Sequence, residues 1–309
     1  MRYRTNTLLG GVLGVALVVV IAAGCGGGKK ASSSTSKTTT TTSTTTTGPS
    51  AGANSKIAAE VPAKYKLKTL TVAADASYAP NEFIGSDGHT VVGMDPDLAN
   101  ALASVMGLKD KVVNATFATI IPGLSSGKYD LGMSSFSDTK AREKVVDFVT
   151  YFSAGTAFYV KSSGPTINAL ADLCGHKVAV ERGTTQEMDA SAQNTKCKKA
   201  GKPGVSVLVF TTQTEANLAI SSGRAQVGMA DSPVAAYIVK QSKGQFKLSG
   251  KVYGTAPYGI AIPKGNGMTK PILDAVKALM GNGTYKSILT KWGIQAGAIS
   301  NPKIDGAIS

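Results

Sequence analysis

A short phrase occurs twice in the chain, as SSGKYDLGMSS at 125–135 and as SSGRAQVGMAD at 221–231. Each copy predicts a helix that ends at a glycine and is followed by a short apolar strand. The strands end at Ser135 and Asp231, and ligands of open α/β sheets bind at the carboxyl ends of strands. A hydroxyl suits a carboxylate, and a carboxylate suits an ammonium group. A similarity this short also arises by chance, but it favours two related lobes that bind one zwitterionic molecule between them.

The chain around these two copies alternates strands and helices. Apolar, β-prone runs predict the strands, whereas caps followed by helical periodicity predict the helices. Asp95, for example, can cap a helix that has Pro96 in its first turn. The pattern predicts an α/β protein in two similar halves. The predicted strands are 69–74, 112–117, 130–133, 156–160, 177–181, 205–210 and 258–262. The predicted helices begin near 95 and 184 and cover 120–126, 214–221, 233–240 and 270–292, the last with a break near 281–283.

The N-terminus has the pattern of a lipoprotein signal peptide. Arg2 and Arg4 precede the apolar run Leu8–Ala23, which is too short for a stable membrane span. The small residues immediately before Cys25 resemble a bacterial lipobox. We therefore expect a signal peptide over 1–24, cleavage before Cys25 and a lipid on its thiol. An ordinary signal peptide that is cut elsewhere and an uncleaved anchor are the alternatives.

The segment 25–59 consists mostly of Gly, Ser, Thr, Ala and Lys. Such a composition cannot bury a core, so we predict a disordered tether that holds an extracytoplasmic body near the cell membrane. The formal net charge is +14, but the lysines are scattered and no basic stripe with aromatic residues indicates nucleic acid. We expect a body facing an anionic membrane and wall, with membrane contact only through the lipid.

Two cysteines remain if Cys25 carries a lipid, namely Cys174 and Cys197. An even pair in an oxidising compartment favours a disulfide, with two buried free thiols as the alternative. No metal-ligand spacing is present, and His89 and His176 lie in polar, turn-like contexts. We therefore predict neither a metal nor a cofactor.

Several segments together resemble the extracellular solute-binding proteins of family 3, the polar amino-acid-binding lipoproteins of ABC importers. They are GMDPDLANALA (93–103), SSFSDTKAREKVVDF (134–148), GTTQE (183–187), the phrase ending at Asp231, and GTYKSILTKWG (283–293). The resemblance implies a two-lobe, periplasmic-binding-protein-like (type II) fold. It also implies a monomer that closes on a free amino acid and delivers it to an ABC permease in the membrane.

The resemblance also implies where the lobes and the hinge lie. Lobe 1 should comprise 66–155 and 256–309, and lobe 2 should comprise 156–255. Two crossover strands, near 154–156 and 252–258, would form the hinge. Closure would follow from ligand contacts that only the closed arrangement makes.

Five residues match the positions that bind the amino-acid backbone in the family. Arg142 would hold the α-carboxylate, because a guanidinium can donate two parallel charge-assisted hydrogen bonds. Ser135 and Ser137 would add a hydroxyl and backbone amides. Thr185, at the start of a helix, would approach the anion from the other lobe. Asp231 would accept from the ammonium group.

Two aromatic residues, Tyr78 and Phe117, match the positions that enclose the ligand's side chain in the family. Simpler interpretations exist for these residues and for two of the binding residues above. Arg142 could instead form a surface ion pair with Glu143 or Asp147, and Thr185 could merely cap its helix. The two aromatic residues could be ordinary core.

Two acids bear on the identity of the ligand. Asp75 matches a family position that contacts the far end of the side chain, and Glu181 ends the strand before GTTQE. Two carboxylates in a dry pocket would repel each other unless the ligand carried a positive charge. We therefore expect arginine, lysine, ornithine or histidine. An ion pair between Glu181 and Arg182 is the alternative.

Two other classes of protein share this type of fold. A secreted enzyme resembling cyclohexadienyl dehydratase would need a general acid in the cleft, for which Glu181 is the candidate. We expect no enzyme, because the sequence offers no Ser–His or Cys–His pairing. The sensor domain of a receptor would need a membrane span and an output domain after the body, and the sequence to Ser309 contains neither.

Overall fold

The computed structural model describes residues 52–308. The predicted signal peptide, Cys25 and most of the predicted tether lie outside these residues. The tether prediction is wrong at its end, because helix α1 (Ser55–Glu60) begins within it. The Asn54 side chain accepts from the backbone N–H of Lys56 at 3.1 Å, and Ile57 is buried in the core. Among the described residues, no helix is long and apolar enough to cross a membrane.

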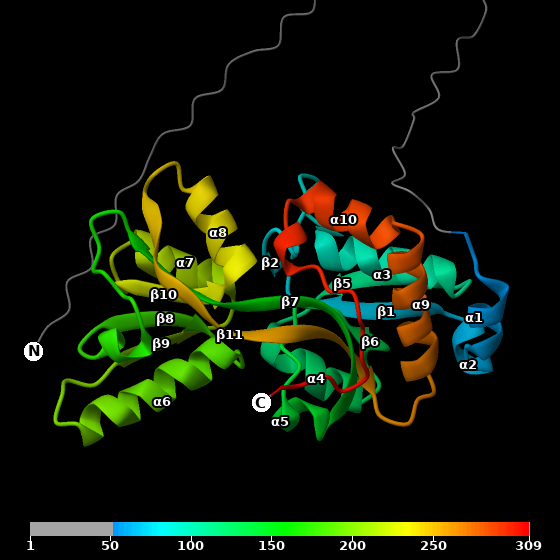
Figure 1. The fold of residues 1–309 in the computed structure, drawn as a ribbon, viewed down its shortest axis with the longest axis horizontal. Helices are drawn as coiled ribbons and strands as arrows, with labels where there is room; N and C mark the ends of the chain where they lie inside the picture. Colours follow the sequence, from blue (N-terminus) through cyan, green and yellow to red (C-terminus); the bar gives the residue numbers. More distant parts are fainter. Residues whose placement is uncertain (1–51, 309) are drawn as a thin grey trace, which may run out of the picture. The chain divides into compact units, whose positions relative to one another are not determined.

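An eight-stranded mixed sheet forms the centre of the described chain, in the order β5-β1-β6-β11-β7-β10-β8-β9 (Figure 1). The long strands β7 and β11 run antiparallel to each other and belong to both halves of the sheet. A small sheet of three strands follows β1. The bounds are β1 Thr69–Ala74, β2 Ser77–Tyr78, β3 Glu82–Ile84, β4 Val91–Val92, β5 Lys109–Asn114, β6 Leu131–Gly132, β7 Val146–Lys161, β8 Lys177–Glu181, β9 Ser206–Phe210, β10 Val227–Asp231 and β11 Phe246–Pro263.

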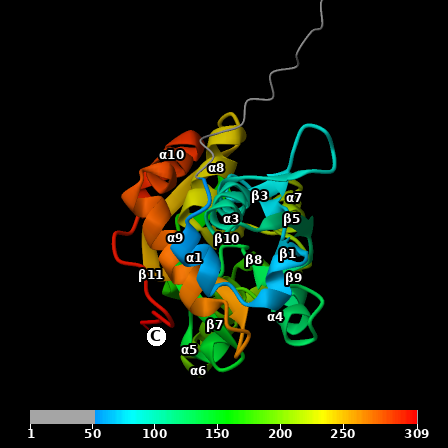
Figure 2. The ribbon, with the colours of Figure 1, turned by 90° about the vertical axis from the view of Figure 1, so that its right-hand side faces the viewer.

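The helices cover both faces of this sheet. In Figures 1 and 2, α3 and α10 lie above the strands of the first half, and α4 and α5 lie below them. In the second half, α7 and α8 lie above, and α6 lies below. The bounds are α2 Ala63–Lys66, α3 Met94–Val105, α4 Phe117–Ser125, α5 Lys140–Glu143, α6 Thr185–Lys199, α7 Gln213–Ser221, α8 Ser232–Gln241, α9 Thr269–Gly281 and α10 Thr284–Trp292, with 3₁₀ turns at Leu170–Leu173 and Gln295–Gly297.

The two halves of the sheet repeat one another. The run β1-α3-β5-α4-β6 has the strand order β5-β1-β6, and the run β8-α6-β9-α7-β10 has the matching order β9-β8-β10. Neighbouring strands within each set of three are parallel. The repeated phrase forms α4 to β6 in one half and α7 to β10 in the other. Gly127 (φ +76°) and Gly223 (φ +78°) adopt the left-handed conformation after the two helices, as the sequence predicts.

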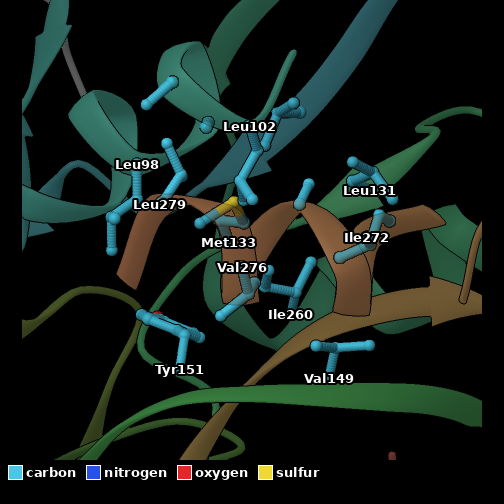
Figure 3. Packing of buried hydrophobic residues seen from close by; sticks show 14 of the residues in the cluster. Leu98, Leu102, Leu131, Met133, Val149, Tyr151, Ile260, Ile272, Val276 and Leu279 are labelled. Atoms are coloured by element: carbon cyan, nitrogen blue, oxygen red, sulfur yellow. The ribbon is translucent and has the colours of Figure 1, made fainter. Parts of the chain in front are cut away.

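The core of the first half lies between the sheet and the helices α3 and α9 (Figure 3). Leu98 and Leu102 of α3, Val276 and Leu279 of α9 and Ile260 of β11 belong to one cluster of buried residues. The spacing of four residues between Leu98 and Leu102 places these two leucines on one face of α3. Burying that face is what holds the helix against the sheet.

Three local predictions differ from the structure. The strand predicted over 112–117 ends at Asn114, because Phe117 begins α4 instead. Helix α3 begins at Met94, with Gly93 at its N-cap position. A Cβ atom at Gly93 would lie 2.1 Å from the carbonyl oxygen of Asn81, so a glycine is required there. The strands predicted over 156–160 and 258–262 are parts of the much longer β7 and β11.

Two features of the second half bear on the predicted hinge and disulfide. The pairing of β7 with β11 is irregular where the strands pass between the halves, with register shifts at Ser249–Tyr253, Tyr253–Ala256 and Tyr258–Gly259. The predicted crossover near 252–258 falls within this stretch. Cys174 and Cys197 form a disulfide, with their Cα atoms 5.7 Å apart.

Candidate ligand-binding site

A narrow pocket lies between the carboxyl ends of the strands of the two halves. All nine ligand-binding residues predicted from the sequence line it, and four more join them. The predicted lining residues are Asp75, Tyr78, Phe117, Ser135, Ser137, Arg142, Glu181, Thr185 and Asp231, and the additional ones are Glu82, Ser134, Thr184 and Gln186.

Arg142 is held in the pocket by both halves of the protein. It belongs to the single turn α5, where Thr139 Oγ1 accepts from its backbone N–H at 3.3 Å. Its Nη1 donates to the carbonyl oxygen of Ser137 at 2.8 Å, and its Nη2 donates to that of Gly183 at 2.9 Å. The guanidinium also lies over the ring of Phe117, 5.3 Å from its centre. Burial lowers the pKa of Arg142 to about 10, so the guanidinium stays charged at neutral pH.

Asp231 is a fixed acceptor at the end of β10. Its Oδ1 accepts from the side-chain amide of Gln186 at 2.7 Å, and its Oδ2 accepts from the hydroxyl of Tyr258 at 2.7 Å. Its backbone N–H donates to the hydroxyl of Tyr78 at 2.9 Å, a bond that joins the two halves. Burial raises the pKa of Asp231, and the three hydrogen-bonding side chains oppose that rise.

Asp75 lines the pocket and also accepts a hydrogen bond from the first residue of helix α4. Its Oδ1 accepts from the backbone N–H and the hydroxyl of Ser77, and its Oδ2 accepts from the backbone N–H of Phe117 at 2.9 Å. The last bond caps α4 from a distant part of the chain. Burial raises the pKa of Asp75 despite these donors.

Glu181 lies beside Asp75, and one of its two carboxyl oxygens lacks a hydrogen bond among the described residues. Glu181 is 2% exposed, and that oxygen is Oε1. Burial, followed by the charge of Asp75, raises the pKa of Glu181 to about 9. The carboxyl is therefore neutral at pH 7 until a positive charge comes close. The alternative pair with Arg182 does not appear among the ion pairs of the described residues.

Thr185 is the first residue of α6, and its neighbour Thr184 caps the helix. The Thr184 hydroxyl accepts from the backbone N–H of Glu187 at 3.2 Å and donates to the carbonyl oxygen of Glu181 at 2.7 Å. Thr185 thus lines the pocket where the first N–H groups of α6 lack helical partners. Such a helix end favours a negatively charged group.

Ser135 does not offer its hydroxyl to the pocket in the way that the sequence suggests. The residue has φ +51°, and its backbone N–H donates to Asp95 Oδ2 at 2.7 Å. Its hydroxyl donates to Glu82 Oε2 at 3.1 Å and accepts from the Asn81 amide at 2.9 Å. These buried partners fix the turn that carries Ser135 and Ser137, so Ser135 shapes the pocket wall.

Of the four additional lining residues, Gln186 and Glu82 escaped the sequence prediction for different reasons. Gln186 follows Thr185 in the GTTQE segment, so its position gave a signal, but its contact with Asp231 depends on the fold. No motif or spacing in the sequence indicated that Glu82 would line the pocket. It is completely buried beside Asp95, and burial raises the pKa of Glu82 well above its usual range.

The family model for bacterial extracellular solute-binding proteins, family 3, matches residues 70–295. The chain belongs to this family, as its motifs predict. It is similar to the arginine-binding protein ArgT of Corynebacterium glutamicum, with 33% identity over 237 residues that cover 76% of this chain and 78% of that protein.

Solved structures of amino-acid-binding proteins have the same fold. An ancestral arginine-binding protein bound to arginine matches with a TM-score of 0.67 and 38% identity, over 72% of this chain and 97% of that one. The ancestral amino-acid-binding protein AncCDT-1, described as a precursor of cyclohexadienyl dehydratase, matches with a TM-score of 0.66 and 35% identity, over 74% and 96%. These matches confirm the predicted α/β, type II solute-binding fold.

Proposed function

We propose that the protein captures a free cationic amino acid outside the cytoplasm and delivers it to an ABC permease. The observation that carries the proposal is the excess of acidic over basic side chains in the pocket. Four acidic side chains line it, and Arg142 is the only basic one among the described lining residues. Arginine, lysine, ornithine or protonated histidine would supply positive charge to the acids and one carboxylate to Arg142.

Each part of such a ligand has a partner of matching chemistry. Arg142 would bind the α-carboxylate, with Ser137 and the first turn of α6 beside it. Asp231 would accept from the α-ammonium. The far end of the side chain would lie near Asp75 and Glu181, where Glu181 Oε1 has no partner among the described residues. A cation there would favour the ionised form of Glu181.

Tyr78 and Phe117 would enclose the aliphatic part of the ligand. Tyr78 is buried, and its hydroxyl already joins the two halves through Asp231. Phe117 stacks on Phe136, with ring centres 4.6 Å apart, and supports the guanidinium of Arg142. The arginine-binding name of the Corynebacterium relative and the arginine-bound ancestral structure support the choice of a cationic ligand.

Binding would close the two lobes, which we place at 66–155 with 256–309, and at 156–255. Ligand contacts from Arg142 on one side and Asp231 on the other would exist only in the closed state. The irregular pairing of β7 with β11 provides a place where the backbone can bend. We further propose that the protein is a monomer attached to the membrane by a lipid on Cys25, beyond a signal peptide over 1–24.

Calorimetry tests this proposal. The purified protein is unfolded and refolded to remove co-purified ligand, and each common amino acid, ornithine and citrulline is titrated into it. We expect micromolar or tighter binding, which corresponds to about −8 kcal/mol, for the cationic amino acids alone. Tight binding of citrulline, the neutral counterpart of arginine, would show that charge does not select the ligand. Absence of binding across the panel would contradict the proposed function.

An enzymatic role is the second candidate, because Glu181 has the raised pKa that a general acid needs and because AncCDT-1 shares the fold. Such an enzyme would protonate the leaving hydroxyl of a cyclohexadienyl carboxylic acid while the bond to the ring carboxylate breaks, so that water and carbon dioxide leave and the ring becomes aromatic. Incubation with this class of compound, followed by the absorbance of the aromatic product, tests the alternative. Turnover that is lost in Glu181→Gln would support it over the binding role.

A further inference from the structure

The last described residues of the chain form a strap along β7. Within the first half of the sheet, one edge of β7 pairs with β11, and residues 303–307, the C-terminal strap, lie on its other edge. Ile304 pairs with Val149, and the Thr150 N–H donates to the carbonyl oxygen of Lys303 at 2.9 Å. The Asp305 N–H donates to the carbonyl oxygen of Phe148 at 3.0 Å.

The end of the strap turns towards the segment that carries Arg142. The Gly306 N–H donates to Asp138 Oδ2 at 2.7 Å, and the Ala307 N–H donates to Glu143 Oε1 at 3.1 Å. Asp138 and Glu143 therefore each lose a hydrogen-bond donor if the strap is removed. These two residues lie on either side of Arg142 in the sequence.

Helix α5 needs such support because it is only one turn long. A single turn fixes several backbone dihedrals for very few hydrogen bonds, so it is unstable alone. Thr139 supplies its cap, and the Asp138 N–H donates to the carbonyl oxygen of Pro257 at 2.8 Å. No whole residue of α5 counts as buried, and its contact with an aromatic side chain is that of the Arg142 guanidinium with the ring of Phe117, so little apolar packing holds the backbone of the turn in place.

We infer that the C-terminal strap is a positioning element that fixes α5, and through it the guanidinium of Arg142, for the carboxylate of the ligand. This inference rests on the proposed function in assigning the carboxylate to Arg142. The family match ends at residue 295, so the strap lies outside the part of the chain that the family model describes.

Two shortened chains test the role of the strap. One ends at Pro302 and lacks it, whereas the other ends at Ala307 and keeps both donors. Calorimetry with L-arginine and with agmatine, which is arginine without its carboxylate, separates positioning of Arg142 from general loss of structure. In the chain that ends at Pro302, we expect arginine to bind at least about tenfold more weakly, or about 1.4 kcal/mol, with agmatine unchanged. The chain ending at Ala307 should bind both as the full chain does.

A variant of the full-length chain provides a second test of the strap's role. Asp138→Ala removes the acceptor of the Gly306 N–H and should weaken arginine binding in the same selective way. Equal losses for arginine and agmatine, or no loss for either, would overturn the inference.

Hydrogen exchange separates failure of the inference from failure of the proposed function. If the full chain does not bind L-arginine, the backbone amides of Arg142, Glu143 and Val145 still report on α5 in the ligand-free protein. Faster exchange of these amides in the chain ending at Pro302, and not in that ending at Ala307, would support the strap's role. Unchanged exchange would overturn it.

Discussion

The guanidinium of Arg142 donates to the carbonyl oxygen of Gly183 at 2.9 Å, across the boundary between the two halves of the sheet. Gly183 immediately precedes the cap of α6, so the residue proposed to bind the ligand's carboxylate also contacts the opposite wall of the pocket. Its other N–H donors remain for a carboxylate. The proposed binding of the ligand's carboxylate and the contact between the halves thus involve the same side chain.

Replacing Arg142 by alanine should weaken binding of a cationic amino acid by about 2–5 kcal/mol, because the ligand's carboxylate would be buried without its partner. Calorimetry provides the measurement. Arg224→Ala is the matched control, since Arg224 is an exposed arginine that lies over the ring of Phe210. Equal effects of the two substitutions would remove Arg142 from the site.

Tyr78→Phe should weaken binding by about 1–3 kcal/mol without changing the pocket's shape. The substitution leaves the buried N–H of Asp231 without its acceptor, and this cost falls on the arrangement seen here, in which the two residues meet and which we propose the ligand stabilises. Titration calorimetry measures the loss, and thermal unfolding of the ligand-free protein serves as the control. An affinity equal to that of the unsubstituted protein would show that the Tyr78 hydroxyl does not contribute to closure.

The sequence predicts much of the site because short motifs carry it. Arg142, Thr185 and Asp231 each lie in a segment whose local structure follows from caps, glycines and apolar runs. Glu82 was out of reach, because only tertiary burial brings it to the pocket. The partner of the Ser135 hydroxyl could not be predicted for the same reason, since Glu82 is distant from it in sequence.

The boundaries of the elements show a related limit. Asp95 is a good cap by residue type, yet its carboxylate accepts from the Ser135 N–H and the Tyr151 hydroxyl instead. Phe117 begins a helix because Asp75 accepts from its N–H, which no local pattern indicates. Tertiary hydrogen bonds thus override local signals where the pocket is built.

Removing the disulfide should reduce stability but leave ligand binding nearly intact. Cys174 and Cys197 are 23 residues apart, and a bridge closing such a loop contributes about 2–4 kcal/mol. Cys197 lies near the far end of α6 from Thr185, about 18 Å along the helix. Urea unfolding and calorimetry of Cys174→Ala/Cys197→Ala check both parts. An affinity loss as large as the stability loss would contradict the separation of disulfide and pocket.

Glu181→Gln should stabilise the ligand-free protein at neutral pH. Folding raises the pKa of Glu181 from 4.5 to about 9, so the unfolded chain loses this proton first as pH rises. The stability of the unsubstituted protein should therefore fall between pH 4.5 and 9, and the cost amounts to up to about 3 kcal/mol at pH 7. Urea unfolding of both proteins at pH 5 and pH 8 measures it. If the gain in free energy of unfolding from Glu181→Gln does not increase with pH, the raised pKa of Glu181 is contradicted.

The same carboxyl should make binding of a cationic amino acid depend on pH. The cation favours ionised Glu181, so binding releases a proton, and affinity should rise with pH by at most about tenfold per unit until it levels off near pH 9. Asp95 and Asp138, whose pKa values are raised to about 6 and about 7, titrate in the same range. Comparison with Glu181→Gln isolates the contribution of Glu181. Calorimetry at pH 6, 7 and 8 should give a steep rise in the unsubstituted protein and a much flatter response in the variant. An equally steep rise in both would assign the proton to another group, and the charge selection proposed for Glu181 would then fail.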